Sequence, residues 1–206
     1  MNPFDNLIHY HVYRGGALPP LTARAYDYVL AGNGLFKRAR SAHITAVIPV
    51  ATARVAGLPE LSKVFRVRPG RIPGQALHII LDDARRHAQA SREQLYQFCV
   101  DAQRIRLVRP SQKATGAKVR YKLDGDQRDL LCDLHSHHTM RALFSSTDDG
   151  DELAFRFYAV IGNLLRKPEI LLRLGVYGDF AYLPATALFT DLGPFVDCFE
   201  EVVYDD

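Results

Sequence analysis

Two histidines and one aspartate have the residue types and spacing that best predict chemistry in this chain. His135 and His137 are separated by one residue at the end of a short apolar run, and Asp148 lies eleven residues beyond the second histidine. If the run is a strand, both imidazoles project to one face, because side chains alternate along a strand. A loop can return the carboxylate to that face. Two histidines and a carboxylate, with a fourth position for water, are typical of a catalytic zinc site.

Two neighbouring residues compete for the same role. His138 directly follows the second histidine, so spacing alone does not choose between these imidazoles. Cys132 stands three residues before His135, but an odd offset turns the two side chains to opposite faces of a strand. A structural zinc site would be closed by four ligands rich in cysteine, which this segment lacks. We therefore favour one zinc ion per chain, bound by His135, His137 and Asp148.

The sequence around this motif predicts strands and one clear helix. Leu130–Leu134 is mostly apolar and predicts a buried strand that ends at the first histidine. Upstream, apolar residues recur at spacings of three and four, with charged residues on the other face, as in an amphipathic helix: Leu77, Ile80, Leu81 and Ala84. Further strands are predicted at Gln94–Val100, Ile105–Val108, Lys118–Leu123, Phe155–Ile161, Ile170–Val176 and Phe180–Leu183. Helix is the second interpretation of Phe155–Ile161, and a turn is expected at Gly178-Asp179.

The first third of the chain predicts short strands. Tyr26–Leu30 and Leu35–Arg38 flank Asn33-Gly34, a pair that tolerates the positive φ angles of a tight hairpin. A β-branched strand over His43–Val50 is expected to end at Pro49, and Val64–Val67 alternates again. The proline- and glycine-rich segment 68–74 predicts a boundary. We divide the chain into a mostly-β region (1–72), a domain that contains the histidine motif (73–189) and an acidic C-terminal tail (190–206).

The composition is that of an ordinary globular protein. The chain has 206 residues, 48% hydrophobic and 24% charged, enough to fill a core without disulfides. Its three cysteines are widely spaced, and neither a leader peptide nor an apolar run of membrane-spanning length is evident, so we expect a cytoplasmic protein. Basic residues gather in segments 37–40, 66–71 and 104–120, but they alternate with apolar residues, which argues against nucleic-acid binding as the main role.

The motif as a whole resembles a known signature. His135-Ser136-His137, seven residues, and then Ser145-x-x-Asp148 resemble the signature of JAMM/MPN-type metallopeptidases. His138 departs from the proline that usually follows the second histidine. The wider chain, including Leu107–Pro110 and Leu174–Gly178, is most similar to the PRTRC system protein A family of plasmid-type gene cassettes. This resemblance implies an α/β fold: a mixed, curved MPN sheet (cytidine-deaminase-like) with packed helices, preceded by the small mostly-β region.

The resemblance also implies a catalytic glutamate upstream of the motif. Glu60 and Glu93 are the two glutamates that precede it, and Glu93 opens the strand after the helix, where the family's glutamate lies. The family often has Glu-x-x-Gly there, whereas this chain has Glu93-Gln94-Leu95-Tyr96. The competing interpretation of Glu93 is an exposed carboxylate at the helix end.

These residues suggest roles in amide hydrolysis. Zinc lowers the pKa of its bound water to near 7, and Glu93 would accept that water's proton and pass it to the leaving amine. Ser145 would donate to the developing oxyanion, although its spacing to Asp148 also matches a helix N-cap. Asp133 would orient an imidazole or face solvent at the strand edge.

The resemblance leaves two classes of function open. One is a zinc metallopeptidase or isopeptidase, possible partners of which are a ubiquitin-like or small-protein substrate and the ThiF/E1-like and ParB-like proteins of the cassette. The other is a non-catalytic MPN scaffold, because members that lose a ligand only assemble complexes. A deaminase ranks third, since the chain lacks Cys-x-x-Cys.

Overall fold

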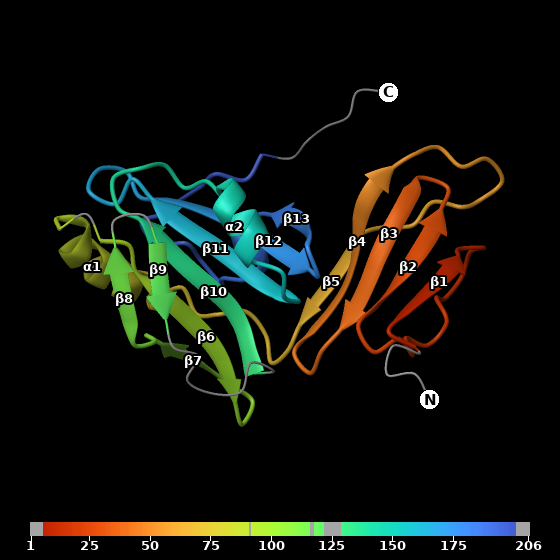
Figure 1. Cartoon of the computed structure of the whole chain (residues 1–206), viewed down its shortest axis with the longest axis horizontal. Coiled ribbons are helices and arrows are strands. Elements are labelled where there is room, and N and C mark those ends of the chain that lie inside the picture. Colours follow the sequence, from red (N-terminus) through yellow and green to blue (C-terminus); the bar gives the residue numbers. More distant parts are fainter. Residues whose placement is uncertain (1–5, 91, 116–117, 122–128, 201–206) are drawn as a thin grey trace.

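The computed structural model describes residues 6–90, 92–115, 118–121 and 129–200, with backbone only for 112–121. Two sheets lie side by side, the N-terminal one in red to orange and the second in green to blue (Figure 1). The predicted mixed α/β fold with a β-rich N-terminal region is confirmed. The N-terminal sheet has the order β1-β2-β3-β4-β5, formed by Ile8–Val12, Tyr26–Ala31, Gly34–Arg40, Ile44–Thr52 and Val64–Val67.

The second sheet carries the candidate site. Its order is β13-β12-β11-β10-β6-β7, and β14 pairs with β12. Its central pair, β10 and β11, is parallel, whereas β10 is antiparallel to β6 and β11 to β12. Its strands are β6 (Leu95–Asp101), β7 (Arg104–Val108), β10 (Leu130–His137), β11 (Arg156–Gly162), β12 (Glu169–Val176), β13 (Asp179–Leu183) and β14 (Val196–Asp197). The remaining elements are α1 (Gln75–Ala88), α2 (Ser146–Asp151), the 3₁₀ turn Ala185–Ala187, and a separate hairpin of β8 (Gln112–Thr115) and β9 (Lys118–Tyr121).

The two faces of the second sheet differ in polarity. The predicted apolar stripe of α1 is buried in one cluster with alternate residues of β6, β10, β11 and β12, such as Phe98, Leu134, Ala159 and Leu172. The opposite face carries a polar row, one residue from each of five neighbouring strands in register: Gln97, Asp133, Tyr158, Arg173 and Tyr182. Apolar residues on the α1 side therefore form the core, and the other face is left for polar chemistry.

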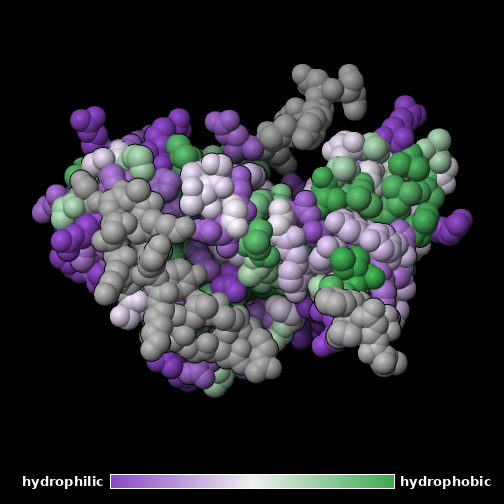
Figure 2. Space-filling view, viewed as in Figure 1, coloured by the Kyte–Doolittle hydropathy of each residue, from purple (hydrophilic) through white to green (hydrophobic). Residues whose placement is uncertain are grey.

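The N-terminal sheet packs on the second sheet through one of its faces. Ala39, Ile44, Ala46 and Ile48 belong to the same hydrophobic cluster as α1. Its other face forms a small core of its own: Val29, Ala31, Phe36 and Val47. In the space-filling view the two sheets form one continuous body, with hydrophobic surface gathered over the N-terminal sheet (Figure 2). Contact between apolar side chains of the two sheets thus fixes the position of one sheet relative to the other.

A buried lysine joins the two sheets. Lys37, 2% exposed, donates to the carbonyl oxygens of Val176 and Tyr177 at 3.2 and 3.1 Å and forms an ion pair with Asp179. Its ammonium also lies 4.3 Å from the centre of the Tyr26 ring, a cation–π contact. Lys37 and its neighbour Arg38 are both buried, so neither contributes to a basic surface patch.

Two sequence predictions were wrong in detail. β4 does not end at Pro49 but continues to Thr52, because β5 pairs with β4 only over Ile44–Val47 and Pro49 needs no N–H on that edge. The turn before β13 is formed by Tyr177 and Gly178, with φ of 51° and 89°, and Asp179 already belongs to the strand. Two successive positive φ angles match the twist of a two-residue hairpin.

The C-terminal segment runs back along the second sheet. β14 pairs with β12, the side chain of Phe195 is buried, and Thr190 donates its N–H to the carbonyl of Ile72 at 2.9 Å. Residues 122–123 of the predicted strand Lys118–Leu123 and residues 201–206 of the acidic tail lie outside the described residues. The three cysteines are free, and none of the helices in the described ranges is long and apolar enough to cross a membrane.

Replacement of the buried lysine tests how the sheets are joined. Lys37→Ala leaves two buried carbonyls and a carboxylate without their cation, so we expect a loss of about 2–3 kcal/mol in the free energy of unfolding. Urea denaturation measures this loss. Lys167→Ala, at an exposed position, is the matched control and should change stability by less than about 0.5 kcal/mol. Equal urea midpoints for the two variants would show that Lys37 does not hold the sheets together.

Candidate metal centre

The structure brings His135, His137 and Asp148 together. Both histidines belong to β10 and face the polar side of the sheet, with their Nε2 atoms 3.1 Å apart. Asp148, in α2, approaches with its Oδ1 atom 3.7 Å from the Nε2 of His135. One potential ligand atom from each residue lies within 4.8 Å of the other two. This arrangement can hold a metal ion.

The surroundings of each imidazole direct its Nε2 atom inward. The Nδ1 atom of His137 lies 3.3 Å from the carbonyl oxygen of Arg141, which can only accept, so Nδ1 carries the proton and Nε2 has a free lone pair. The Nδ1 atom of His135 faces Glu152 Oε1 at 4.0 Å. Burial lowers the pKa of His135 to about 4 and also lowers that of His137. Both rings are therefore neutral at pH 7, the form in which histidine binds metals.

A capping box fixes the aspartate. Ser145 is the N-cap of α2, and its backbone N–H and hydroxyl donate to Asp148 Oδ2 at 2.6 and 2.7 Å, while its Oγ accepts from the Asp148 N–H. The carboxylate is thereby turned so that Oδ1 faces the histidines. Burial alone would raise the pKa of Asp148, but His135 and the bonds from Ser145 outweigh it, and the pKa lies below its usual value. Ser145 thus makes the hydrogen bonds of a helix N-cap, as its spacing to Asp148 predicted.

Arg173 and Glu152 complete the surroundings, and sequence reasoning missed both. Arg173 is 1% exposed, lies between the rings of Phe144 and Phe180 at 3.8 and 3.7 Å, and donates to Asp149 and twice to Glu152. Burial raises the pKa of Glu152 to about 8, although the guanidinium opposes this. The acidic residues that follow Asp148 in the sequence could have pointed to the carboxylates of Asp149 and Glu152. Nothing in the sequence linked the run to an arginine on β12.

Glu93 lies at the edge of the same site. It is half-buried, and burial together with the negative charge of Asp148 raises its pKa to about 7. Its position depends on Ser136, which stands between the two histidines: the Gln94 N–H donates to Ser136 Oγ and the Ser136 N–H to the Gln94 carbonyl, both at 2.9 Å. The histidine strand therefore holds the glutamate segment directly. Tyr96, at the position of the expected glycine, turns to α1 and donates to Asp83.

The competing residues lie elsewhere. His138 is half-buried and bonds to Thr139, with a φ of 23° that no proline could adopt. The thiol of Cys132 is buried on the core side, with its S–H toward a backbone carbonyl. Asp133 is buried too, but it accepts from Gln97 at 2.9 Å and from Arg156 at 3.1 Å instead of orienting an imidazole.

Close packing replaces the family's proline in the loop after the histidines. The carbonyl of His138 accepts from the N–H of Leu164, and that of Met140 accepts from Asn163. A Cβ atom at Gly162, the register partner of His137, would lie 2.4 Å from backbone atoms of residues 140–142. The absence of a side chain at Gly162 thus lets the loop lie against β11, and the loop in turn supplies the carbonyl that binds His137.

The donor set fits a divalent metal ion. Two neutral imidazole nitrogens and an ionised carboxylate oxygen face one point, with supporting groups behind each of them. Imidazole suits zinc, copper, iron and nickel better than magnesium or calcium, which prefer oxygen ligands. The half-buried carboxylate of Glu93 lies beside this set, and a carboxylate can exchange a proton with water.

Comparison with known proteins agrees with this geometry. A search of curated proteins found no match. The family model for prokaryotic homologs of the JAB domain (Prok-JAB) matches residues 30–174, which include β10, α2 and Glu93. Because this match covers more than half of the chain, the protein belongs to the Prok-JAB family.

Proposed function

We propose that the protein is a zinc-dependent metallopeptidase or isopeptidase that hydrolyses an amide bond. The observation that carries the proposal is the convergence of His135, His137 and Asp148 beside Glu93, whose pKa is about 7. A zinc ion held by the first three residues would polarise the substrate carbonyl and lower the pKa of a coordinated water from about 15.7 to near 7.

Two residues of the chain would move or hold protons. The carboxylate of Glu93 accepts a proton from the attacking water and delivers it to the leaving amine nitrogen. Ser145 orients Asp148 in the resting site. The Ser145 hydroxyl has a single proton, so this hydroxyl must break its hydrogen bond to Asp148 Oδ2 before it can donate to the oxyanion. The Ser145 backbone N–H continues to donate to Asp148 Oδ2.

The substrate and partners follow from the resemblance to the PRTRC system protein A family. We propose a ubiquitin-like or other small protein as substrate, with ThiF/E1-like and ParB-like proteins of the same cassette as partners. Three free cysteines are compatible with the reducing bacterial cytoplasm in which such a cassette would act. Known Prok-JAB relatives include both hydrolases and non-catalytic members, so the experiments below separate metal binding from turnover.

Zinc analysis tests the ligand set. When both are purified without chelator, the His137→Ala variant should contain one zinc per chain fewer than the wild type, because the two remaining ligands hold the ion poorly. His138→Ala, one residue further along an exposed loop, is the matched control and should keep the wild-type content. Mass-spectrometric metal analysis gives both values. A folded His137→Ala protein with the full wild-type zinc content would disprove the assignment.

Glu93→Gln tests catalysis separately from metal binding. The variant keeps the zinc ligands but has no group that accepts a proton, so turnover should fall at least about 100-fold at unchanged zinc content. The assay follows release of a fluorescent amine from the C-terminus of a ubiquitin-like protein of the cassette. Glu60→Gln, at an exposed position, should retain activity. Equal rates for Glu93→Gln and wild type would show that another residue is the general base. A zinc-loaded wild type without turnover would favour a non-catalytic scaffold protein.

The raised pKa of Glu93 predicts a pH dependence of stability in the metal-free protein. The pKa rises from 4.5 to about 7 on folding, so the folded state holds the proton more tightly and stability falls as pH increases across this window. Above pH 7 the buried charge costs on the order of 1 kcal/mol, since half of the group still faces solvent. Glu93→Gln should therefore be more stable than wild type at pH 8 and not at pH 4.5. Chelator-treated samples in thermal unfolding provide the measurement, and a difference that is equal at both pH values would refute the assigned environment.

A further inference from the structure

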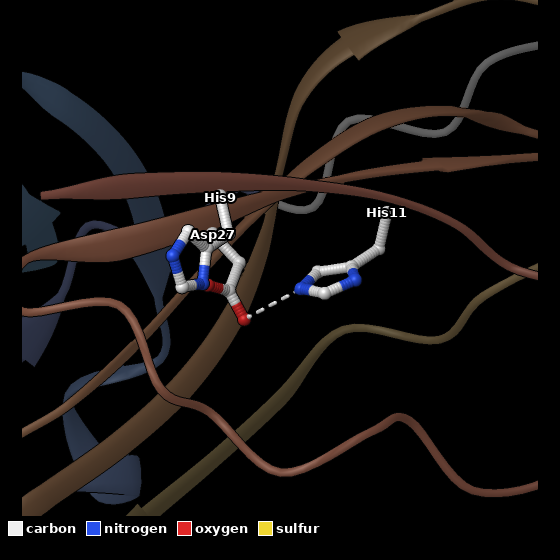
Figure 3. Close-up of side chains that lie close together, drawn as sticks. All are labelled: His9, His11 and Asp27. Carbon is white, nitrogen blue, oxygen red and sulfur yellow. Dashed lines mark ion pairs between the residues drawn. The ribbon is translucent and has the colours of Figure 1, made fainter. Parts of the chain in front are cut away.

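A second pair of histidines separated by one residue lies in the N-terminal sheet. β1 runs parallel to β2 with His9 in register with Asp27, so His9, His11 and Asp27 share one face. One nitrogen from each ring and one carboxylate oxygen lie within 4.8 Å of one another. Figure 3 shows the two rings beside the carboxylate, with His11 Nε2 3.4 Å from Asp27 Oδ2. This face is the one turned away from the second sheet, since the neighbouring Val29 belongs to the smaller core.

Two buried atoms in this group lack hydrogen-bond partners. The side chain of Asp27 is fully buried, and Arg38 binds its Oδ2 atom through both Nε and Nη2. The Oδ1 atom of Asp27 and the Nε2 atom of His11 are buried without such a partner. An unpaired buried polar atom destabilises the fold and is uncommon in native proteins. Two of them at one point indicate that a bound group is needed to satisfy them.

His9 is prepared to be a third ligand. Its Nε2 atom lies 3.2 Å from the side-chain oxygen of Asn6, which can only accept, so the proton is on Nε2 and the lone pair on Nδ1. That Nδ1 atom is 4.0 Å from Asp27 Oδ1 and 3.2 Å from the hydroxyl of Thr22. That hydroxyl donates to the Nδ1 lone pair in the metal-free site, and it would turn away from the ring when a metal binds there. An oxygen that orients the imidazole from behind is the usual companion of a metal-binding histidine.

We propose that His9, His11 and Asp27 form a second transition-metal site, of the zinc type, that fastens the N-terminal strand to its sheet. Two imidazoles and one carboxylate suit zinc and exclude magnesium and calcium as preferred ions. The ligands come from both β1 and β2, and β1 is the edge strand, paired with β2 alone. Arg38 forms an ion pair with Asp27 and so neutralises part of its negative charge. This site therefore binds zinc less tightly than the candidate metal centre and loses its zinc first to a chelator.

Zinc content in a variant without the first centre tests the proposal. Full-length His137→Ala loaded with Zn²⁺ and desalted should contain about one zinc per chain. His137→Ala/His11→Gln should contain none, and His137→Ala/His9→Gln should likewise lose it. The control is His137→Ala/His43→Ala, because His43 lies in the same region at 3.4 Å from a carboxylate but in no group of three. This control should keep its zinc. Circular dichroism of each variant checks that it is folded.

Hydrogen exchange provides the second measurement. Zinc should slow exchange of the β1 amides in His137→Ala by at least about tenfold and leave them unchanged in His137→Ala/His11→Gln. Failure of the proposal is distinct from failure of the proposed function, since both measurements are made without the first centre. A folded His137→Ala protein that holds no zinc, or zinc that persists in both double variants with glutamine, would overturn the second site.

Discussion

The candidate metal centre depends on the ion pairs that the buried guanidinium of Arg173 forms with neighbouring carboxylates. Four carboxylates gather around the site, namely Glu93, Asp148, Asp149 and Glu152, and two of them, Asp148 and Glu152, approach His135. Arg173 binds two of them and is itself held between two aromatic rings. Without this cation, α2 would bring unpaired negative charge onto a buried strand, at a cost that its six residues could not offset by their own packing, since none of them is buried.

The remaining negative charge explains why a divalent cation suits the site. Arg173 donates to Asp149 and Glu152, whereas burial and, in addition, the negative charge of Asp148 raise the pKa of Glu93. A cation between His135, His137 and Asp148 would relieve this repulsion and lower the pKa of Glu93. The proton affinity of this carboxylate would thus respond to a bound metal, and the reciprocal bonds between Ser136 and Gln94 hold the backbone next to it.

The sequence predicted those parts of the site that depend on short spacings. The alternation of His135 and His137, the cap formed by Ser145 and the amphipathic stripe of α1 are each set within one or two turns or strand steps. The bond between Arg173 and Glu152 depends instead on how β12 pairs with β11, and no local pattern carries that register. Pro49 was misjudged for a related reason, because whether a strand tolerates proline depends on the length of its neighbour.

The same limit explains why the second pair of histidines escaped notice. His9 and His11 alternate as plainly as His135 and His137, but their carboxylate comes from a parallel neighbour across a long connection, and its register cannot be deduced from spacing. The two sites differ physically in consequence. Asp148 is positioned by the side-chain bonds of a helix cap, whereas Asp27 is positioned by the backbone ladder of a sheet. Spacing within one segment can therefore reveal the first kind of group, but the second kind becomes visible only once the pairing of the strands is known.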